Sequence, residues 1–67
     1  MFEYCLINDD PDNNSTTIIN GAGSIDIDGS SSEIYVNTLN DLSGDGWEVV
    51  TVYKYFRDIY TLLKRPT

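Results

Sequence analysis

Residues 47 to 64 read WEVVTVYKYFRDIYTLLK, and this stretch decides the fold. Two runs rich in β-branched and aromatic residues, 47–56 and 59–64, flank the polar pair Arg57-Asp58, which predicts a β-hairpin with a two-residue turn. In that register Tyr55 lies opposite Tyr60. Both faces of the hairpin are then apolar: one carries Val50, Val52, Phe56, Ile59 and Leu63, and the other carries Trp47, Val49, Tyr53, Tyr55, Tyr60 and Leu62.

A helix is predicted over residues 31–43, just before the hairpin. Ser30 stands three residues before Glu33, a spacing typical of a capping box. Gly44 and Gly46 then offer the backbone freedom that a sharp reversal from helix to strand requires. An apolar stripe at helical spacing consists of Tyr35, Leu39 and Leu42, flanked by Ile34 and Val36.

Three short strands are predicted upstream, at residues 2–7, 16–20 and 24–28. The polar segment 8–29, rich in Asn, Asp, Gly and Ser, suits either a mobile loop or a two-stranded flap. The chain therefore reads as a single α+β domain over residues 1–67. We expect a small twisted antiparallel sheet of three to five strands, with one amphipathic helix packed on one face. The other apolar face must then meet the 8–29 segment, a second subunit or a ligand.

The charge of the chain is strongly uneven. The 67 residues carry 11 acids and 4 bases, for a net charge of -7, and all four bases lie in the last fourteen positions. Such a surface repels duplex nucleic acid and anionic lipid, so neither is an expected partner. A basic protein is a candidate partner, because the acids could also mimic nucleic acid. The plainer interpretation is that the charge keeps the protein soluble.

Stability and location follow from what the sequence lacks. No basic leader segment and no apolar run of about 20 residues is present, so we expect a cytoplasmic protein without a membrane partner. Cys5 is the only cysteine and there is no histidine, which excludes an internal disulfide and the usual zinc ligand sets. Cys5 is expected to be buried. Self-association is the remaining way to stabilise so short a chain, so a homo-oligomer is expected.

Catalysis is not expected, and neither is a metal or other cofactor. Without histidine the available general bases are carboxylates, and no glycine-rich phosphate loop precedes a helix. Asp26 and Asp28 fit the third and fifth positions of a calcium-binding EF-hand loop. The two ends of that loop would then be Ser24 and Tyr35, which cannot anchor the ion.

The aromatic hairpin is the candidate functional surface. Tyrosines beside lysine and arginine could stack against and neutralise a small anionic ligand such as a nucleotide, although packing in a core or an interface explains the same pattern. We expect Trp47 to act mainly as a packing anchor, and Glu48 to pair with Arg65 or with backbone N–H groups. The candidate interface or ligand residues are Trp47, Tyr53, Tyr55, Tyr60, Lys54, Arg57 and Lys64.

The leading functional hypothesis is a small acidic interaction module that is not an enzyme. It would form a homo-oligomer through the aromatic sheet face and act through protein–protein contacts. One alternative is a phage-type inhibitor or nucleic-acid mimic that blocks a basic host protein. A second alternative is a sponge that sequesters a small anionic nucleotide.

Three strings follow one another between residues 35 and 66: Leu39-Asn40-Asp41-Leu42, Gly44-Asp45-Gly46-Trp47-Glu48 and Lys64-Arg65-Pro66. This pattern resembles a family of small bacterial and phage-borne domains catalogued as domain of unknown function 4177. The resemblance implies a strand, a helix, a glycine turn and a hairpin that ends in Lys-Arg-Pro, and it implies no activity. The 8–29 segment is longer than in that pattern, so we expect any role particular to this chain to lie there.

Overall fold

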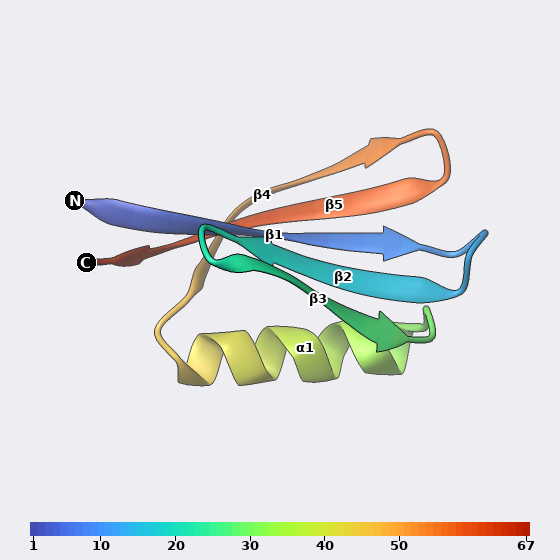
Figure 1. Cartoon of the computed structure of the whole chain (residues 1–67), viewed down its shortest axis with the longest axis horizontal. Helices are drawn as coiled ribbons and strands as arrows, with labels where there is room; N and C mark the ends of the chain where they lie inside the picture. Colours follow the sequence, from blue (N-terminus) through green and yellow to red (C-terminus); the bar gives the residue numbers. More distant parts are fainter.

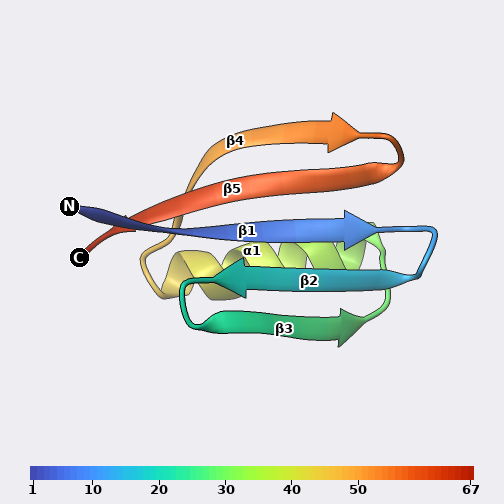
Figure 2. The same ribbon diagram turned by 45° about the horizontal axis from the view of Figure 1, so that its top comes forward.

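A computed structural model describes all 67 residues. Its elements are β1 (Phe2–Asp10), β2 (Ser15–Asn20), β3 (Gly23–Asp28), α1 (Ser32–Gly44), β4 (Glu48–Tyr55) and β5 (Asp58–Pro66). The five strands form one antiparallel sheet in the order β3-β2-β1-β5-β4, as Figure 2 shows. The predicted α+β class with a small antiparallel sheet is confirmed. The single helix is too short and too polar to cross a lipid bilayer.

The first and last strands of the chain pair at the centre of the sheet. β1 lies antiparallel to β5 from the Phe2–Pro66 pair to the Asp9–Ile59 pair. The two chain ends therefore lie side by side (Figure 1), and the Thr67 N–H donates a hydrogen bond of 3.1 Å to the Met1 carbonyl.

The 8–29 segment takes the flap form rather than the loop form. Its first residues extend β1 beyond the predicted end at residue 7, because β5 offers backbone partners as far as Asp9 and β2 as far as Asp10. The segment then forms the β2–β3 hairpin, which pairs along the free side of β1. Strands were expected at 16–20 and 24–28, and both are confirmed to within one residue.

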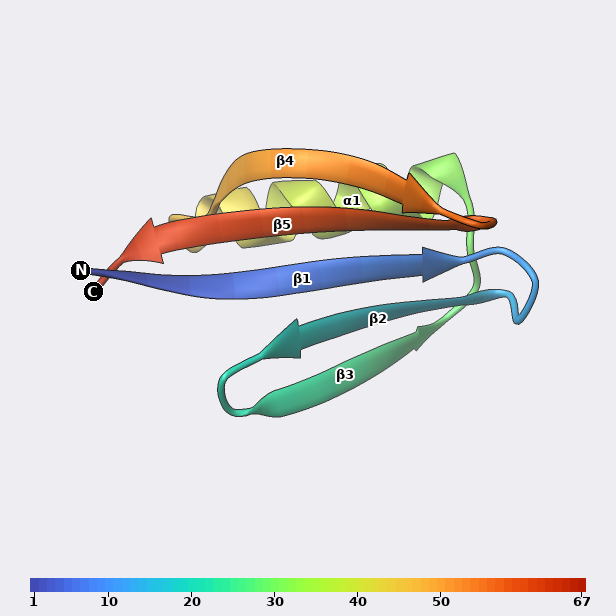
Figure 3. The same cartoon turned by 90° about the horizontal axis from the view of Figure 1, so that it is seen from above.

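The core is small and lies on one side of the sheet. Cys5, Ile7, Leu63 and Trp47 form a buried cluster, against which two leucines of α1, Leu39 and Leu42, are packed. Figure 3 shows α1 running along this side. The predicted burial of Cys5 is confirmed, and burial raises the pKa of its thiol. Only seven of the 67 residues are buried, so the fold has little interior to stabilise it.

The helix begins one residue later than predicted. Ser31, not Ser30, is the N-cap, and its hydroxyl accepts a hydrogen bond of 3.2 Å from the Ile34 N–H. Ser30 instead donates its hydroxyl to the Asp9 carboxylate. The expected capping box is therefore not formed, because it requires the acid at the third helical position and Glu33 occupies the second.

The helix ends with a single left-handed glycine. Gly46 has φ 92°, a conformation that favours glycine, whereas Gly44 remains the last residue of the helix. The Trp47 N–H donates to the Leu42 carbonyl at 3.0 Å, which satisfies one of the carbonyls that a helix end leaves free. Of the two glycines expected at this reversal, only Gly46 provides the special backbone conformation.

The predicted hairpin turn is wrong by one residue, and the predicted strand pairing is therefore wrong by two. The turn is Phe56-Arg57, with Tyr55 opposite Asp58, and so Tyr60 lies opposite Tyr53 rather than Tyr55. Phe56 has φ 57°, which is unusual for a bulky residue and gives no signal in sequence. The shift moves both strands equally and keeps most side chains on their predicted faces. Three residues are exceptions. Phe56 lies in the turn and Trp47 lies in the core. Val49 lies opposite Leu63 because of a bulge between Val49 and Thr51.

Candidate interaction surface

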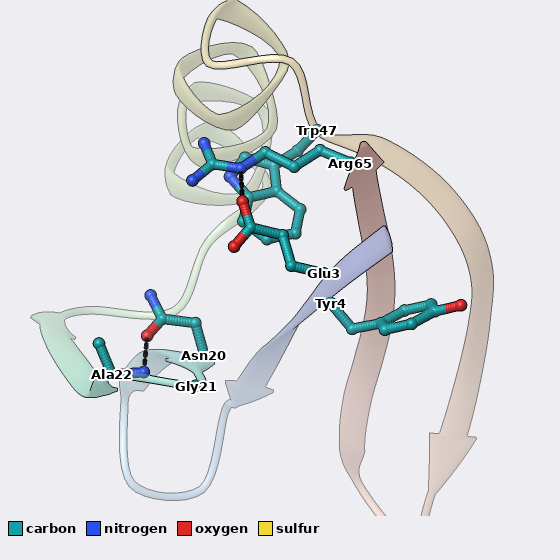
Figure 4. Close-up of a pocket in the computed structure, with 7 residues that line it drawn as sticks. All are labelled: Glu3, Tyr4, Asn20, Gly21, Ala22, Trp47 and Arg65. Carbon is teal, nitrogen blue, oxygen red and sulfur yellow. Dashed lines mark hydrogen bonds and ion pairs between the residues drawn. The ribbon is translucent and has the colours of Figure 1, made fainter. Parts of the chain in front are cut away.

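The sheet face opposite α1 carries most of the exposed aromatic side chains. Side chains alternate along a strand, so the residues between the buried positions of β1 and β5 point away from the core. Figure 4 shows Tyr4 on the other side of β1 from Glu3, and Figures 1 and 3 show no element over this face. We call it the open face; its central members are Phe2, Tyr4, Leu6, Tyr53, Tyr55, Tyr60, Leu62 and Lys64.

The rings of the open face are ordered by strand pairing. Tyr53 and Tyr60 lie directly opposite each other and stack, with ring centroids 5.1 Å apart and an interplanar angle of 13°. Lys64 lies opposite Tyr4, and its Nζ is 4.4 Å from the centre of the Phe2 ring. Tyr4 sits on the central strand, yet 53% of its surface is exposed. A central strand normally buries such a ring, so this face lacks a cover.

One end of the open face is acidic. The pKa of Asp58 is raised, first by its loss of solvent and then by the charge of Asp10. The pKa of Asp10 is lowered by hydrogen bonds from the side chain and backbone of Asn13. Loss of solvent, and next the Asp58 charge, raises the pKa of Tyr60. This end of the face therefore repels an anionic ligand and suits a neutral or cationic one.

The structure divides the residues that were predicted as one functional surface. Tyr53, Tyr55, Tyr60 and Lys64 share the open face. Lys54 follows Tyr53 directly and so points to the opposite face. Arg57 lies in the turn, where it pairs with Asp12 at 3.2 Å. Trp47 is only 7% exposed and belongs to the core, which agrees with its expected packing role.

Three members of the open face lie on β1, outside the hairpin that was predicted to carry this surface. Phe2, Tyr4 and Leu6 alternate with Glu3, Cys5 and Ile7 along β1. That alternation is visible in the sequence. Their place beside the hairpin tyrosines depends on the β1–β5 pairing, which joins residues about sixty positions apart and has no local signal.

A pocket of about 360 Å³ lies on the other side of β1, between the β2–β3 turn and Trp47 (Figure 4). Arg65 dominates it. Its guanidinium stacks on the Trp47 ring at 4.5 Å, pairs with Glu3 and donates to the Asp45 carbonyl at 3.2 Å. The expected pairing of Glu48 with Arg65 is therefore wrong, because Glu48 lies opposite Lys64 on the open face. Since the guanidinium is already engaged on three sides, the pocket offers little free charge to a ligand.

A second hollow, of about 310 Å³, lies between α1 and the β4–β5 hairpin. Tyr35 is one of its lining residues, and a 2.7 Å hydrogen bond joins the Tyr35 hydroxyl to that of Thr61. The remaining lining residues are Asp9, Ser32, Val36, Val52 and Ile59. No group of three or more Cys, Asp or Glu side chains comes together here or elsewhere to hold a metal ion.

The open face is therefore an exposed and largely apolar surface with no element of the chain over it. No protein-family model, no curated protein and no solved structure matches this chain.

Proposed function

We propose that this chain is a small acidic interaction module, not an enzyme, which forms a homo-oligomer through the open face. The apolar stripe of α1 covers one face of the sheet in this proposal, and a second copy covers the other. The observation that carries it is the half-exposed aromatic surface across β1, β5 and β4, which nothing in the chain covers.

The area that such a contact would bury is modest. A tyrosine or phenylalanine buries about 150–250 Å² when covered, and Phe2, Tyr4 and Tyr53 are each about half exposed. Covering these and the neighbouring rings in both copies would remove on the order of 800 Å² from water. An interface of this size belongs with weak or transient contacts, because association itself costs about 4–15 kcal/mol and stable interfaces bury about 1,200–2,000 Å².

Sedimentation equilibrium of two matched variants tests the proposal. Tyr4→Asp places a charge in the middle of the open face and is expected to lower the average mass. Ile25→Asp makes a comparable change on β3, at a side chain that is 60% exposed. Ile25 pairs with Ile18, which pairs with Ile7, so it lies on the opposite face of the sheet from Tyr4. It is expected to keep the wild-type mass. A folded Tyr4→Asp variant with the wild-type mass, or a wild type that stays monomeric at every concentration, would refute the proposal.

The inhibitor alternative draws on one further observation. Asp9, Asp10, Asp12 and Asp58 lie at the end of the sheet where β1 turns into β2, and they outnumber the two bases at that end, Lys54 and Arg57. Such an end could occupy a basic groove of another protein. Binding of this kind should weaken steeply with salt, so affinity for a captured basic partner that is unchanged between low and high salt would exclude it.

The nucleotide sponge has less support. It needs the tyrosines and bases on one surface, whereas Lys54 lies on the opposite face and Arg57 is paired with Asp12. Membership of the family of unknown function 4177 remains part of the proposal. It is supported by the order of strand, helix, glycine turn and hairpin along the chain.

A further inference from the structure

β4 is an edge strand with few of the features that protect such an edge. It is the outermost strand on the hairpin side of the sheet (Figure 2), and all eight of its residues are exposed. Proteins usually guard such an edge with charges, prolines or bulges, because free N–H and C=O groups pair readily with another strand. The opposite edge, β3, carries Asp26 and Asp28 and begins at Gly23. The β4 run from Val49 to Tyr55 has Lys54 as its only charge.

The regular part of this edge has defined limits. A bulge between Val49 and Thr51 ends it on one side, and the Phe56-Arg57 turn ends it on the other. The paired segment available is therefore Thr51 to Tyr55. In a two-residue hairpin the residues flanking the turn bond to each other, so the backbone groups of Tyr55, Tyr53 and Thr51 face β5. The backbone N–H and C=O groups of Val52 and Lys54 point away from β5, toward the unpaired edge of the sheet.

We infer that β4 pairs antiparallel with β4 of a second copy, about a two-fold axis at Tyr53, and so joins two five-stranded sheets into one. Tyr53 is the centre of the regular segment, so this register uses all of it. Val52 of each copy then exchanges backbone hydrogen bonds with Lys54 of the other. Tyr53 lies beside its own equivalent on the open face, and the aromatic surface continues across the join.

Charge favours this edge for contact between two acidic copies. All four bases of the chain lie between Lys54 and Arg65, so two copies of net charge -7 repel each other least along the β4–β5 hairpin. In this register Lys54 faces Val52 rather than another lysine. The antiparallel arrangement also brings the Glu48 end of each strand toward the Arg57 end of the other.

The two-fold pairing is also self-limiting. An antiparallel contact between identical strands closes with two copies, because each supplies the same surface to the other. Pairing of β4 with β3 of the next copy would be head-to-tail and would build an open polymer. The edge contact is separate from the burial of the open face proposed above, and either can hold without the other.

Backbone methylation of the full synthetic chain tests the edge contact. N-methylation of the Val52 amide removes an outward donor without altering a side chain, and it is expected to weaken one association step about 10- to 100-fold in sedimentation equilibrium. The matched control is N-methylation of Asp26 on β3. Gly23 closes the β2–β3 turn with Asn20, so the backbone groups of Gly23 and Ile25 face β2. The amide of Asp26 therefore faces outward, as that of Val52 does. The control is expected to change nothing. An unchanged mass with methylated Val52, or an equal loss with methylated Asp26, would overturn the inference.

Cross-linking gives a second measurement that does not depend on the methylated chain folding. Tyr53→Cys is expected to form a disulfide dimer on mild oxidation, because equivalent residues at the axis lie about 4.5 Å apart between Cα atoms. Tyr55→Cys is the control, because its equivalents are about 13 Å apart in this register. Equal cross-linking of both variants would reject the register. Methylating Val52 in the Tyr4→Asp variant separates the two contacts. The open-face contact is already lost in that variant, so loss of the edge contact should convert its remaining dimers to monomers.

Discussion

Replacing Phe56 by its D-enantiomer is expected to stabilise the protein. Phe56 occupies the first position of the β4–β5 turn with φ 57°, where an L-residue pays about 1–2 kcal/mol because its Cβ approaches the following carbonyl oxygen. A D-residue prefers this region, so the strain is removed. The ring is 82% exposed, and its edge contact with Tyr55 at 4.5 Å is worth about 0.5 kcal/mol at most at such a site. The expected net gain is about 1 kcal/mol.

The gain is large enough to measure in so small a domain. Total stability should be roughly 3–10 kcal/mol at 0.05–0.15 kcal/mol per residue, and each kcal/mol should shift Tm by about 4–8 °C. Thermal and urea unfolding of the synthetic chain, followed by circular dichroism below the concentration of association, would report it. The D-enantiomer of Arg57, whose φ is negative, is the control and should destabilise by a similar amount. A D-Phe56 chain with an unchanged or lower Tm would refute the strained-turn argument.

Two further predictions concern the core and the acidic end of the sheet. Ile7→Ala, at a fully buried site, should lower the free energy of unfolding by about 2–5 kcal/mol and leave much of the protein unfolded. Ile25→Ala, at an exposed site, should lower it far less. Similar urea midpoints for the two variants would show that the core is not centred on Ile7. Asp58→Asn should raise Tm at pH 7, because desolvation and the charge of Asp10 raise the pKa of Asp58 and its ionised form is disfavoured in the fold. The stability linked to a raised pKa is present at low pH and is lost as the pH rises through that pKa, so the difference in Tm between variant and wild type should vanish near pH 3. A difference that persists at pH 3 would contradict this prediction. So would an equal effect of the control variant Asp41→Asn, at an exposed position of α1.

The local parts of the fold could be read from the sequence, and the parts that needed a distant partner could not. The hairpin of β4 and β5, the helix and the two middle strands each leave a periodic pattern within a few residues. The cap was misplaced because Ser30, Ser31 and Ser32 are equivalent as capping residues, and the choice depends on Asp9, which takes the Ser30 hydroxyl. The turn was misplaced because nothing in its residues indicates a phenylalanine with positive φ.

The open face shows the same division. The tyrosines of the hairpin were expected on one face, and a register error of one residue in each strand left them there. Tyr4 could not be added, because only the β1–β5 pairing brings it beside Lys64. Lys54 was grouped with the tyrosines through its place in the chain, although neighbours along a strand point to opposite faces.

The central pairing of β1 with β5 also sets the order in which the protein can form during synthesis. β1, β2 and β3 can join into a meander as soon as they leave the ribosome, since each strand follows its partner closely. The other side of β1 must wait for β5, which is made after the other four strands and the helix. Until then the nascent chain exposes Cys5 and Ile7 and an unpaired strand edge, so this protein should fold late and slowly for its size and should be most prone to aggregate before β5 arrives.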